Sequence, residues 1–277
     1  MTVWAHTLVK NEARWLWYSV SSVIEYVDKV LIWDTGSSDN TLQVVSHLID
    51  KYKDRISFRD YGDVDKFTFG KARQDMLEAT KSDWFLMLDG DEIWWDESIK
   101  KVVQEMKDNK SESIVVPTIN LVGDIFHHQE KAAGRYHLAG KIGHYNLRGV
   151  NRNIPGLSSF GEHGVWGWVD GEGKMIQNRS EDKVLFIDAP YLHATNLRRS
   201  TKLSKDREVM KREGKIRYEL GIDFPLDFYY PEVLFRPSPM EIESPWMTMD
   251  KGYKFRAFFE TPLRKIKRRV FRGKVGY

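Results

Sequence analysis

Hydrophobic residues change period repeatedly along the first third of the chain, from the short runs of strands to the spacing of helices. Apolar runs typical of buried strands occupy 3–9, 30–33, 56–58 and 84–88. Apolar residues at spacings of three and four predict helices over 11–27, from about 40 onward, and over 69–80. Repeated strand–helix units predict an α/β fold with a mixed, mainly parallel sheet, right-handed crossovers and flanking helices.

The pattern becomes less regular after residue 91. It predicts a charged amphipathic helix over 97–107, strands over 113–117 and 184–187, and a basic helix over 197–212. Residues 121–182 are rich in Gly, His and Trp and predict loops with short antiparallel strands. We therefore predict one domain over 1–195, with a regular α/β part over 1–120 and a less regular part over 121–195. Residues 196–277 are predicted to form a C-terminal extension.

Composition narrows the class of protein. The 277 residues include 41% hydrophobic and 30% charged residues, which is typical of a globular chain. The absence of cysteine excludes disulfides and thiolate metal sites and fits a cytoplasmic protein. No signal peptide is visible at the N-terminus, and no run approaches the ~18 apolar residues of a spanning helix.

Charge is distributed unevenly around the net value of +3. Residues 251–277 hold ten Lys and Arg with one acidic residue, Glu260, which leaves a net charge of −6 in 1–250. An acidic body argues against general nucleic-acid binding, so no nucleic-acid partner is expected.

Polar residues follow three of the predicted strands at the point where each strand ends. Asp89 and Asp91 follow the run 84–88 with Gly90 between them, so both carboxylates project to one side of an extended segment. Carboxylate pairs suit a hard divalent cation, and ligands of open α/β sheets bind at this edge. A polar turn after a strand is the alternative for an isolated Asp-x-Asp.

The set of strand-end segments resembles the family 2 glycosyltransferases with the GT-A (Rossmann-like) fold. The segments "TLVKNE", "DTGSSDNT", "GKARQDML" and "WFLMLDGDE" appear in the family's order and spacing within residues 3–100. The resemblance implies an inverting enzyme that uses a nucleotide-sugar donor (UDP-, GDP- or dTDP-linked) and Mn²⁺ or Mg²⁺. It also implies that residues 1–195 form the catalytic domain, in which 1–120 bind the nucleotide sugar and 121–195 bind the acceptor. It implies nothing specific about the acceptor, which we leave open as a glycan, a lipid-linked molecule or a protein.

The resemblance also implies roles at matching positions. Thr7 and Val9 would line the nucleobase pocket with Glu12 nearby, and Asp34 would accept a hydrogen bond from the base or ribose. Asp89 would contact the ribose or the metal, and Asp91 would be the main metal ligand. Two basic residues, Lys71 and Arg73, would reach the base or the phosphates. The alternatives are a solvated helix face for Lys71 and Arg73, and a role for Glu12 at the positive end of its own helix.

His193 follows the predicted strand 184–187 and precedes a pair of arginines. Many GT-A enzymes place a late histidine on the metal, and an imidazole beside carboxylates favours Mn²⁺ over Mg²⁺. We therefore add His193 to the metal site, against the alternative of a hydrogen-bonded structural histidine. Arg198 or Arg199 would neutralise the departing diphosphate, unless both belong to a solvated basic helix.

An inverting transfer needs a base for the acceptor's hydroxyl proton. Glu162, in Phe-Gly-Glu-His-Gly, resembles the family's acidic residue beside a histidine, although the common order is His-Glu. Asp170 and Glu172 are the alternatives. Trp166 and Trp168 would stack on a sugar or pack in the core. The absence of the Gln-x-x-Arg-Trp segment of processive synthases favours transfer of a single sugar.

Two other classes of protein share parts of this pattern. A sugar nucleotidyltransferase also uses an α/β sheet and acidic metal ligands, but it needs a Gly-rich basic loop, and residues 7–12 contain no glycine. A catalytically silent binding protein would keep the fold without the need for the acidic residues and His193.

The basic tail has a pattern of its own. Thr261 and Pro262 predict a helix start, Gly273 predicts its end, and four apolar residues fall on one face between basic ones: Phe259, Leu263, Ile266 and Val270. Such a segment, 255–273, resembles an interfacial helix on anionic lipid. Docking on the acidic body of the protein is the alternative, so a peripheral membrane contact remains an expectation.

Overall fold

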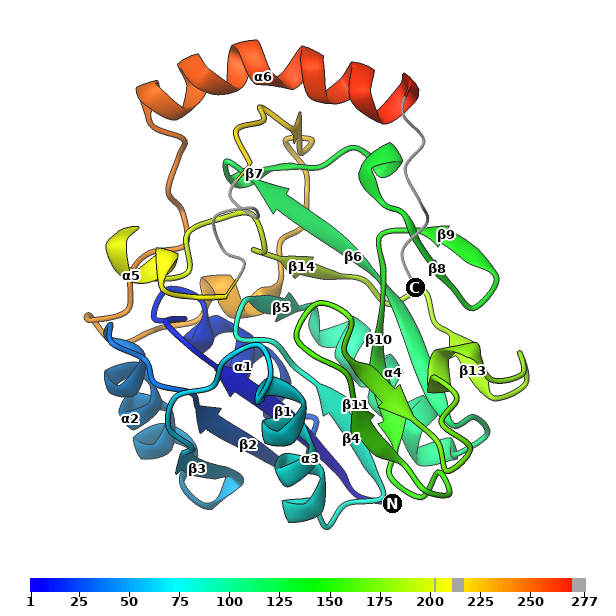
Figure 1. The fold of residues 1–277 in the computed structure, drawn as a ribbon. Coiled ribbons are helices and arrows are strands. Elements are labelled where there is room, and N and C mark those ends of the chain that lie inside the picture. The colour runs from blue at the N-terminus through cyan, green and yellow to red at the C-terminus, as the bar shows by residue number, and fades with distance from the viewer. Residues whose placement is uncertain (202, 211–216, 271–277) are drawn as a thin grey trace.

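A computed structural model describes residues 1–201, 203–210 and 217–270 of the chain (Figure 1). Its main feature is one large mixed sheet, in which the described strands follow the order β15-β7-β6-β10-β4-β1-β2-β3, with β5, β13 and β14 attached beside this path. Helices cover both faces, and α6 lies across one end of the molecule (Figure 1). The predicted α/β architecture is confirmed.

The N-terminal half of the sheet is parallel. It consists of β1 (Val3–Val9), β2 (Lys29–Asp34), β3 (Ile56–Asp60) and β4 (Trp84–Met87). Val9 pairs with Asp34, and His6 pairs with Met87, so these strands end at the same edge. The polar residues that follow them in the sequence therefore converge there.

The two faces of the sheet are covered by different helices. Val3, Ala5 and Val9 point into a large core with α1 (Leu16–Val23), α2 (Thr41–Tyr52) and α4 (Asp96–Asp108). Trp4 and Leu8 point to the other face, where α3 (Phe69–Ala79) supplies Met76. This alternation of side chains along β1 is the period of two expected of a strand buried on both faces.

The second half of the sheet is mostly antiparallel, as its irregular pattern predicted. β10 (Tyr145–Asn151) lies between β4 and β6 (Ser113–Val122), and β7 (Asp124–His128) continues beyond β6. β14 (Tyr191–His193) pairs with β6 and with β5 (Glu92–Trp94), which places His193 opposite Glu92. A strand that the sequence pattern did not predict therefore carries His193 to the acidic segment.

The remaining elements are short. β13 (Val184–Phe186) pairs with β6, and two hairpins lie outside the main sheet: β8 (Tyr136–Leu138) with β9 (Lys141–Gly143), and β11 (Ser158–Phe160) with β12 (Gly167–Val169). Single 3₁₀ turns are η1 (Lys53–Arg55), η2 (Lys131–Ala133), η3 (Ile176–Asn178) and η4 (Glu232–Phe235).

Two predicted helices differ from the observed ones. The first begins at Leu16 rather than at 11, because Asn11 has a left-handed backbone (φ 54°) and uses its side chain to bind the neighbouring loops. The basic helix over 197–212 is wrong over 197–201, and the observed helix α5 spans Leu203–Arg207. Asp206 accepts hydrogen bonds from the N–H groups of Arg199 and Ser200, which holds this segment in a loop. Residues 211–212 lie outside the described residues.

The tail helix α6 spans Lys251–Val270, so the predicted start at Thr261 and Pro262 is wrong. Asp250 caps the helix instead, because its Oδ1 accepts a hydrogen bond from the N–H of Tyr253 at 2.7 Å. Pro262 lies inside the helix, and the predicted end at Gly273 lies outside the described residues. None of the described helices is long and apolar enough to cross a membrane.

His127 links β7 to β15 through two aspartates and gives stability that should depend on pH. Its Nδ1 contacts Asp124, and its Nε2 lies 2.8 Å from Asp223 on β15 (Ile222–Asp223). The hydrogen bond with Asp124 raises the pKa of His127 above its usual 6.5. The stabilisation is therefore complete below that value and is lost as pH rises through the folded pKa.

We expect His127→Gln to lower the melting temperature more at about pH 5.5 than at about pH 9. Thermal unfolding of the parent and the variant across this range measures the difference. The effect should be small, because the partner Asp223 is largely exposed. A difference that grows as pH rises would contradict this account.

Candidate active site

A cavity of about 450 Å³ lies at the carboxyl edge of the parallel strands. Its lining includes Val9 at the end of β1, Thr35 after β2, Asp89 after β4, and His193 and Arg199 around β14. The backbone at Gly90 lies close to Glu12, because a Cβ there would be 3.1 Å from that side chain. The three predicted strand ends therefore meet at one cavity, together with the segment that carries His193.

Asp89 is the carboxylate that faces this cavity. It is 34% exposed and lies 3.3 Å from Arg73 on α3 and 3.1 Å from Arg148 on β10. Burial acts to raise the pKa of Asp89, but the charges of Arg148 and Arg73 lower it to about 2. Asp89 is therefore ionised at any physiological pH.

Asp91 is completely buried behind Asp89 and contacts two basic groups. Its carboxylate lies 3.4 Å from Nε2 of His193 and 2.7 Å from Arg199, which also pairs with Glu12 at 2.5 Å. Burial lowers the pKa of His193, so the imidazole is neutral at pH 7 and suited to bind a cation. Burial opposes a charged Arg199, but Asp91 and Glu12 raise its pKa.

The residues present fit a divalent metal ion. Among the described residues, Asp89, Glu92 and His193 each offer a ligand atom within 4.8 Å of the others. One neutral imidazole with carboxylates is a donor set suited to Mn²⁺. Asp91 lies against the same histidine, so a metal ion here would be held by Asp89 and His193 with either Asp91 or Glu92.

Glu92 and Arg148 are the functional residues that the sequence pattern did not identify. Glu92 is buried and contacts the Arg148 guanidinium, whose Nε also lies 3.1 Å from the Tyr191 hydroxyl. Arg148 therefore connects two carboxylates of the site to the centre of the sheet. Its only sequence signal is a charge between Leu147 and Val150 in a strand, since a buried charge requires a partner.

The residues predicted for the nucleobase pocket form two groups. Val9 lines the cavity, whereas Thr7 is buried and is not among the lining residues. Asp34 Oδ1 accepts hydrogen bonds from the N–H groups of Gly36 and Ser37, and its buried Oδ2 has no hydrogen-bond partner among the described residues. Asp34 therefore shapes the turn after β2 and keeps one acceptor atom for another group.

The basic residues predicted to bind the donor also form two groups, inside and outside the lining of the cavity. Arg73 is buried, lines the cavity and lies 5.3 Å from the ring centres of Phe69 and Trp166. Lys71 is exposed, pairs with Asp75 at 2.7 Å and is not among the lining residues. Arg198 is exposed and lines a different cavity, so Arg199 occupies the place beside the carboxylates that the sequence left open between the two.

A loop over 161–166 forms the outer wall of the cavity. It contributes His163, Gly164 and Trp166 to the lining, whereas Glu162 is exposed and is not among the lining residues. The loop approaches α3 closely, because a Cβ on Gly70 would lie 2.7 Å from the Gly161 carbonyl. Glu162 is therefore next to the cavity in sequence but outside its lining.

The alternatives to Glu162 have other surroundings. Asp170 is buried, contacts Arg179 and accepts hydrogen bonds from two N–H groups of its own turn, so it has a structural role. Glu172 is exposed in the same turn. Trp168 packs edge-on against Phe85 in the core, whereas Trp166 is at the cavity wall.

Comparison with known proteins identifies a family. The model described as "Glycosyl transferase family 2" matches residues 6–161, which is more than half of the chain. A TPR repeat-containing protein of Synechococcus elongatus is 33% identical over 85 residues, which cover 31% of this chain and 19% of that protein.

Three solved structures are similar at low identity. TarS of S. aureus has a TM-score of 0.48 and 14% identity, covering 72% of this chain and 38% of its own. The Pyrobaculum calidifontis mannosyltransferase PcManGT, in complex with GDP-Man and Mn²⁺, has a TM-score of 0.46 and 14% identity. The match covers 71% of this chain and 57% of the mannosyltransferase. Glucosyl-3-phosphoglycerate synthase from Mycobacterium tuberculosis has a TM-score of 0.44 and 15% identity. The match covers 69% of this chain and 71% of the synthase. The chain spans less than two thirds of the length of the TPR repeat-containing protein and of TarS.

Proposed function

The chain belongs to glycosyl transferase family 2, and on that premise we propose that it transfers a single sugar from a nucleotide-sugar donor to an acceptor, with inversion and with a divalent metal. The observation that carries the proposal is the cluster of Asp89, Asp91, His193 and Arg199 at the edge of the parallel strands. This cluster combines anionic groups for a metal with cationic groups for a diphosphate.

Each part of the cavity has a role in this reaction. The wall formed by Val9, Glu12 and Thr35 would hold the nucleoside. Asp34 is buried in the turn beside Thr35 and is not among the lining residues, so its free oxygen would have to become exposed to bind the base or ribose. Arg73 and Arg199 would face the diphosphate, since a guanidinium pairs with phosphate oxygens in a fixed geometry. A divalent metal held by Asp89, Asp91 and His193, with Glu92 as the neighbouring carboxylate, would neutralise charge on the leaving nucleoside diphosphate.

The test is incubation with UDP-, GDP- and dTDP-linked sugars in Mn²⁺ or Mg²⁺, with detection of released nucleoside diphosphate. A glycosyltransferase releases it with one donor class, at least slowly to water, and chelator stops the release. A sugar nucleotidyltransferase instead releases pyrophosphate from a nucleoside triphosphate and a sugar phosphate. A silent binding protein binds nucleotide and releases neither product.

We also propose that α6 holds the enzyme at an anionic membrane face. The helix docks through Ala257 and Thr261, which are buried, and through Arg268, which pairs with Glu130 and Glu219. The opposite face is exposed and apolar: Phe255, Phe259, Leu263, Ile266 and Val270. The alternative of docking on the acidic body therefore accounts for one face of α6, whereas the apolar stripe stays exposed, with Leu263 at 67%.

Basic residues lie beside this exposed apolar stripe. Lysines and arginines flank it on both sides of the helix, at Lys251, Lys254, Lys265, Lys267 and Arg269. Each basic residue near an anionic surface contributes about 1 kcal/mol, and the apolar residues add to this. An anionic lipid surface is therefore the partner that fits α6, and it would place the site near a lipid-linked or membrane-proximal acceptor.

We expect the protein to sediment with vesicles that contain acidic lipid and to sediment less with neutral vesicles. The bound fraction should decline as salt rises, because charges are screened within about 10 Å at 0.1 M salt. Leu263→Ser with Ile266→Ser should abolish it without loss of stability. Leu226→Ser with Met240→Ser, two exposed apolar residues elsewhere, is the matched control. Equal binding to neutral and acidic vesicles, or none to either, would contradict the proposal.

A further inference from the structure

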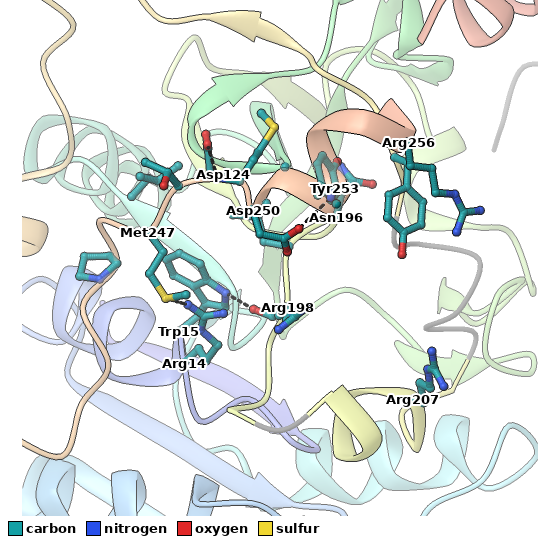
Figure 2. A pocket seen from close by; sticks show the side chains of 18 of the residues that line it. Arg14, Trp15, Asp124, Asn196, Arg198, Arg207, Met247, Asp250, Tyr253 and Arg256 are labelled. Atoms are coloured by element: carbon teal, nitrogen blue, oxygen red, sulfur yellow. Dashed lines mark hydrogen bonds between the residues drawn. The ribbon is translucent and has the colours of Figure 1, made fainter. Parts of the chain in front are cut away.

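A second and larger cavity, of about 1100 Å³, lies between α6 and the body of the protein (Figure 2). Its walls come from segments far apart in the sequence: the loop after β1, the segment after β14, the turn between β6 and β7, and the start of α6. None of the roles proposed above uses this space.

Arginine is the dominant charged residue of the lining. Five arginines surround the cavity: Arg14, Arg198, Arg207, Arg256 and Arg264. The lining contains two acidic residues, and both have structural partners. Asp124 binds His127 and the N–H of Met249, and Asp250 caps α6. Three of the arginines are neutralised from outside the lining, because Arg14 pairs with Glu243 and both Arg256 and Arg264 pair with Glu260.

Two of these arginines are available to a ligand. Arg198 and Arg207 are exposed, and neither forms an ion pair with another residue of the described chain. Arg14 is buried and pairs with Glu243 at 3.0 Å. Burial lowers the pKa of Arg14, and the nearby charge of Arg198 adds to this against the opposing charge of Glu243. A bound anion would relieve this repulsion.

The remaining groups suit an anion with several oxygen atoms. Arg256 lies over the ring of Tyr218 at 3.8 Å, which holds its guanidinium in one orientation. Figure 2 shows Arg14, Arg198 and Arg207 at separate points around the open space, with Trp15 as an apolar wall. Guanidinium groups spread over several elements match the several oxygens of a phosphate or diphosphate.

The second cavity adjoins the cavity of about 450 Å³ proposed to bind the donor, here called the donor cavity, because the same chain segments line both. Glu12 lines the donor cavity, whereas Arg14 lines the second one two residues later. After β14 the same alternation occurs, because His193 and Arg199 line the donor cavity while Arg198 lines the second. A molecule held in the second cavity therefore lies next to the proposed transfer site.

From this placement we propose that the second cavity binds the phosphate group of a phosphate-bearing acceptor, and this rests on the proposed glycosyltransferase function. The phosphate would be held by Arg198 and Arg207, with Arg14 behind them. The same chemistry belongs to a water-soluble phosphate ester and to a lipid with a phosphate headgroup, which would enter beneath α6.

Direct binding tests this independently of transfer. Calorimetric titration with inorganic pyrophosphate, in the presence of chelator, should give an affinity that falls about 10-fold or more in Arg198→Gln with Arg207→Gln. Arg152→Gln, an exposed arginine elsewhere, is the control and should bind as the parent does. Affinity for nucleoside diphosphate with Mn²⁺ should be the same in parent and variants, which separates this cavity from the donor site.

Vesicles distinguish the two sources of phosphate. Phosphatidylcholine vesicles with phosphatidic acid are compared with vesicles that contain the same fraction of phosphatidylserine. A preference for phosphatidic acid that the double variant loses supports a lipid headgroup, and a loss confined to pyrophosphate supports a soluble phosphate ester. Unchanged pyrophosphate affinity in the double variant, or no binding by the parent, overturns the proposal. If the parent binds pyrophosphate but does not bind nucleoside diphosphate with Mn²⁺, the result would instead count against the proposed function.

Discussion

Replacing Asp91 by asparagine is expected to abolish measurable sugar transfer and to weaken Mn²⁺ binding by about 10²-fold or more, since even residues behind a ligand cost 10–100-fold. The carboxylate is fully buried against His193 and Arg199, so its charge would act on both the proposed metal site and the proposed diphosphate site. Asparagine keeps the shape of the side chain, and Arg199 keeps its pair with Glu12. The melting temperature should therefore change little.

Comparison with two neighbouring carboxylates identifies the ligand. Asp89→Asn and Glu92→Gln are titrated with Mn²⁺ beside Asp91→Asn, with the exposed Asp54→Asn as the control. The proposal requires that Asp89→Asn and Asp91→Asn both weaken Mn²⁺ binding. If Glu92→Gln weakens it and Asp91→Asn does not, Asp91 positions His193 instead. Normal transfer by Asp91→Asn, or a parent enzyme insensitive to chelator, would refute the metal site.

Local patterns predicted the parallel half of the fold because its interactions are local or repetitive. The run 84–88 is apolar on both faces since β4 is covered by helices and by the β11–β12 hairpin, and such a run has few other conformations. The start of α1 was not predictable in the same way. Asn11 is held in a left-handed conformation by hydrogen bonds to residues 38 and 205, which no local pattern reports.

The tail shows a second limit of local patterns. Pro262 after Thr261 is a common helix start, but the capping side chain at Asp250 and the buried contact of Ala257 favour a longer helix. Propensity is a weak preference, and tertiary contacts override it. The apolar stripe itself was predicted correctly, because its spacing does not depend on where the helix begins.

The site was predictable where its residues follow strands and not where they enter from elsewhere. The parallel strands bring Val9 and Asp89 to one edge, and the prediction needs only the strand order. Arg148 comes from the middle of β10, and its role appears only when that strand is placed beside β4. The choice between Arg198 and Arg199 depends on which way each side chain points from a loop, and adjacent residues there face different cavities.

Replacing Glu162 by glutamine is expected to lower turnover by about 10²–10⁴-fold with little change in donor binding, the usual contribution of a general base. The acidic residues in the described lining of the donor cavity are Glu12 and Asp89, and both pair with arginines. Neither is suited to take a proton from an acceptor. Glu162 is exposed and precedes the lining residue His163, in a loop that Gly70 allows to approach α3.

The measurement is the initial rate at saturating donor, with donor affinity measured separately by titration. Glu97→Gln, an exposed glutamate on α4, is the matched control and should leave turnover unchanged. Because a lost base slows the chemical step alone, the variant should bind nucleoside diphosphate as tightly as the parent. Normal turnover in Glu162→Gln would remove Glu162 from the reaction and direct the same test to Glu172, since Asp170 is committed to its pair with Arg179.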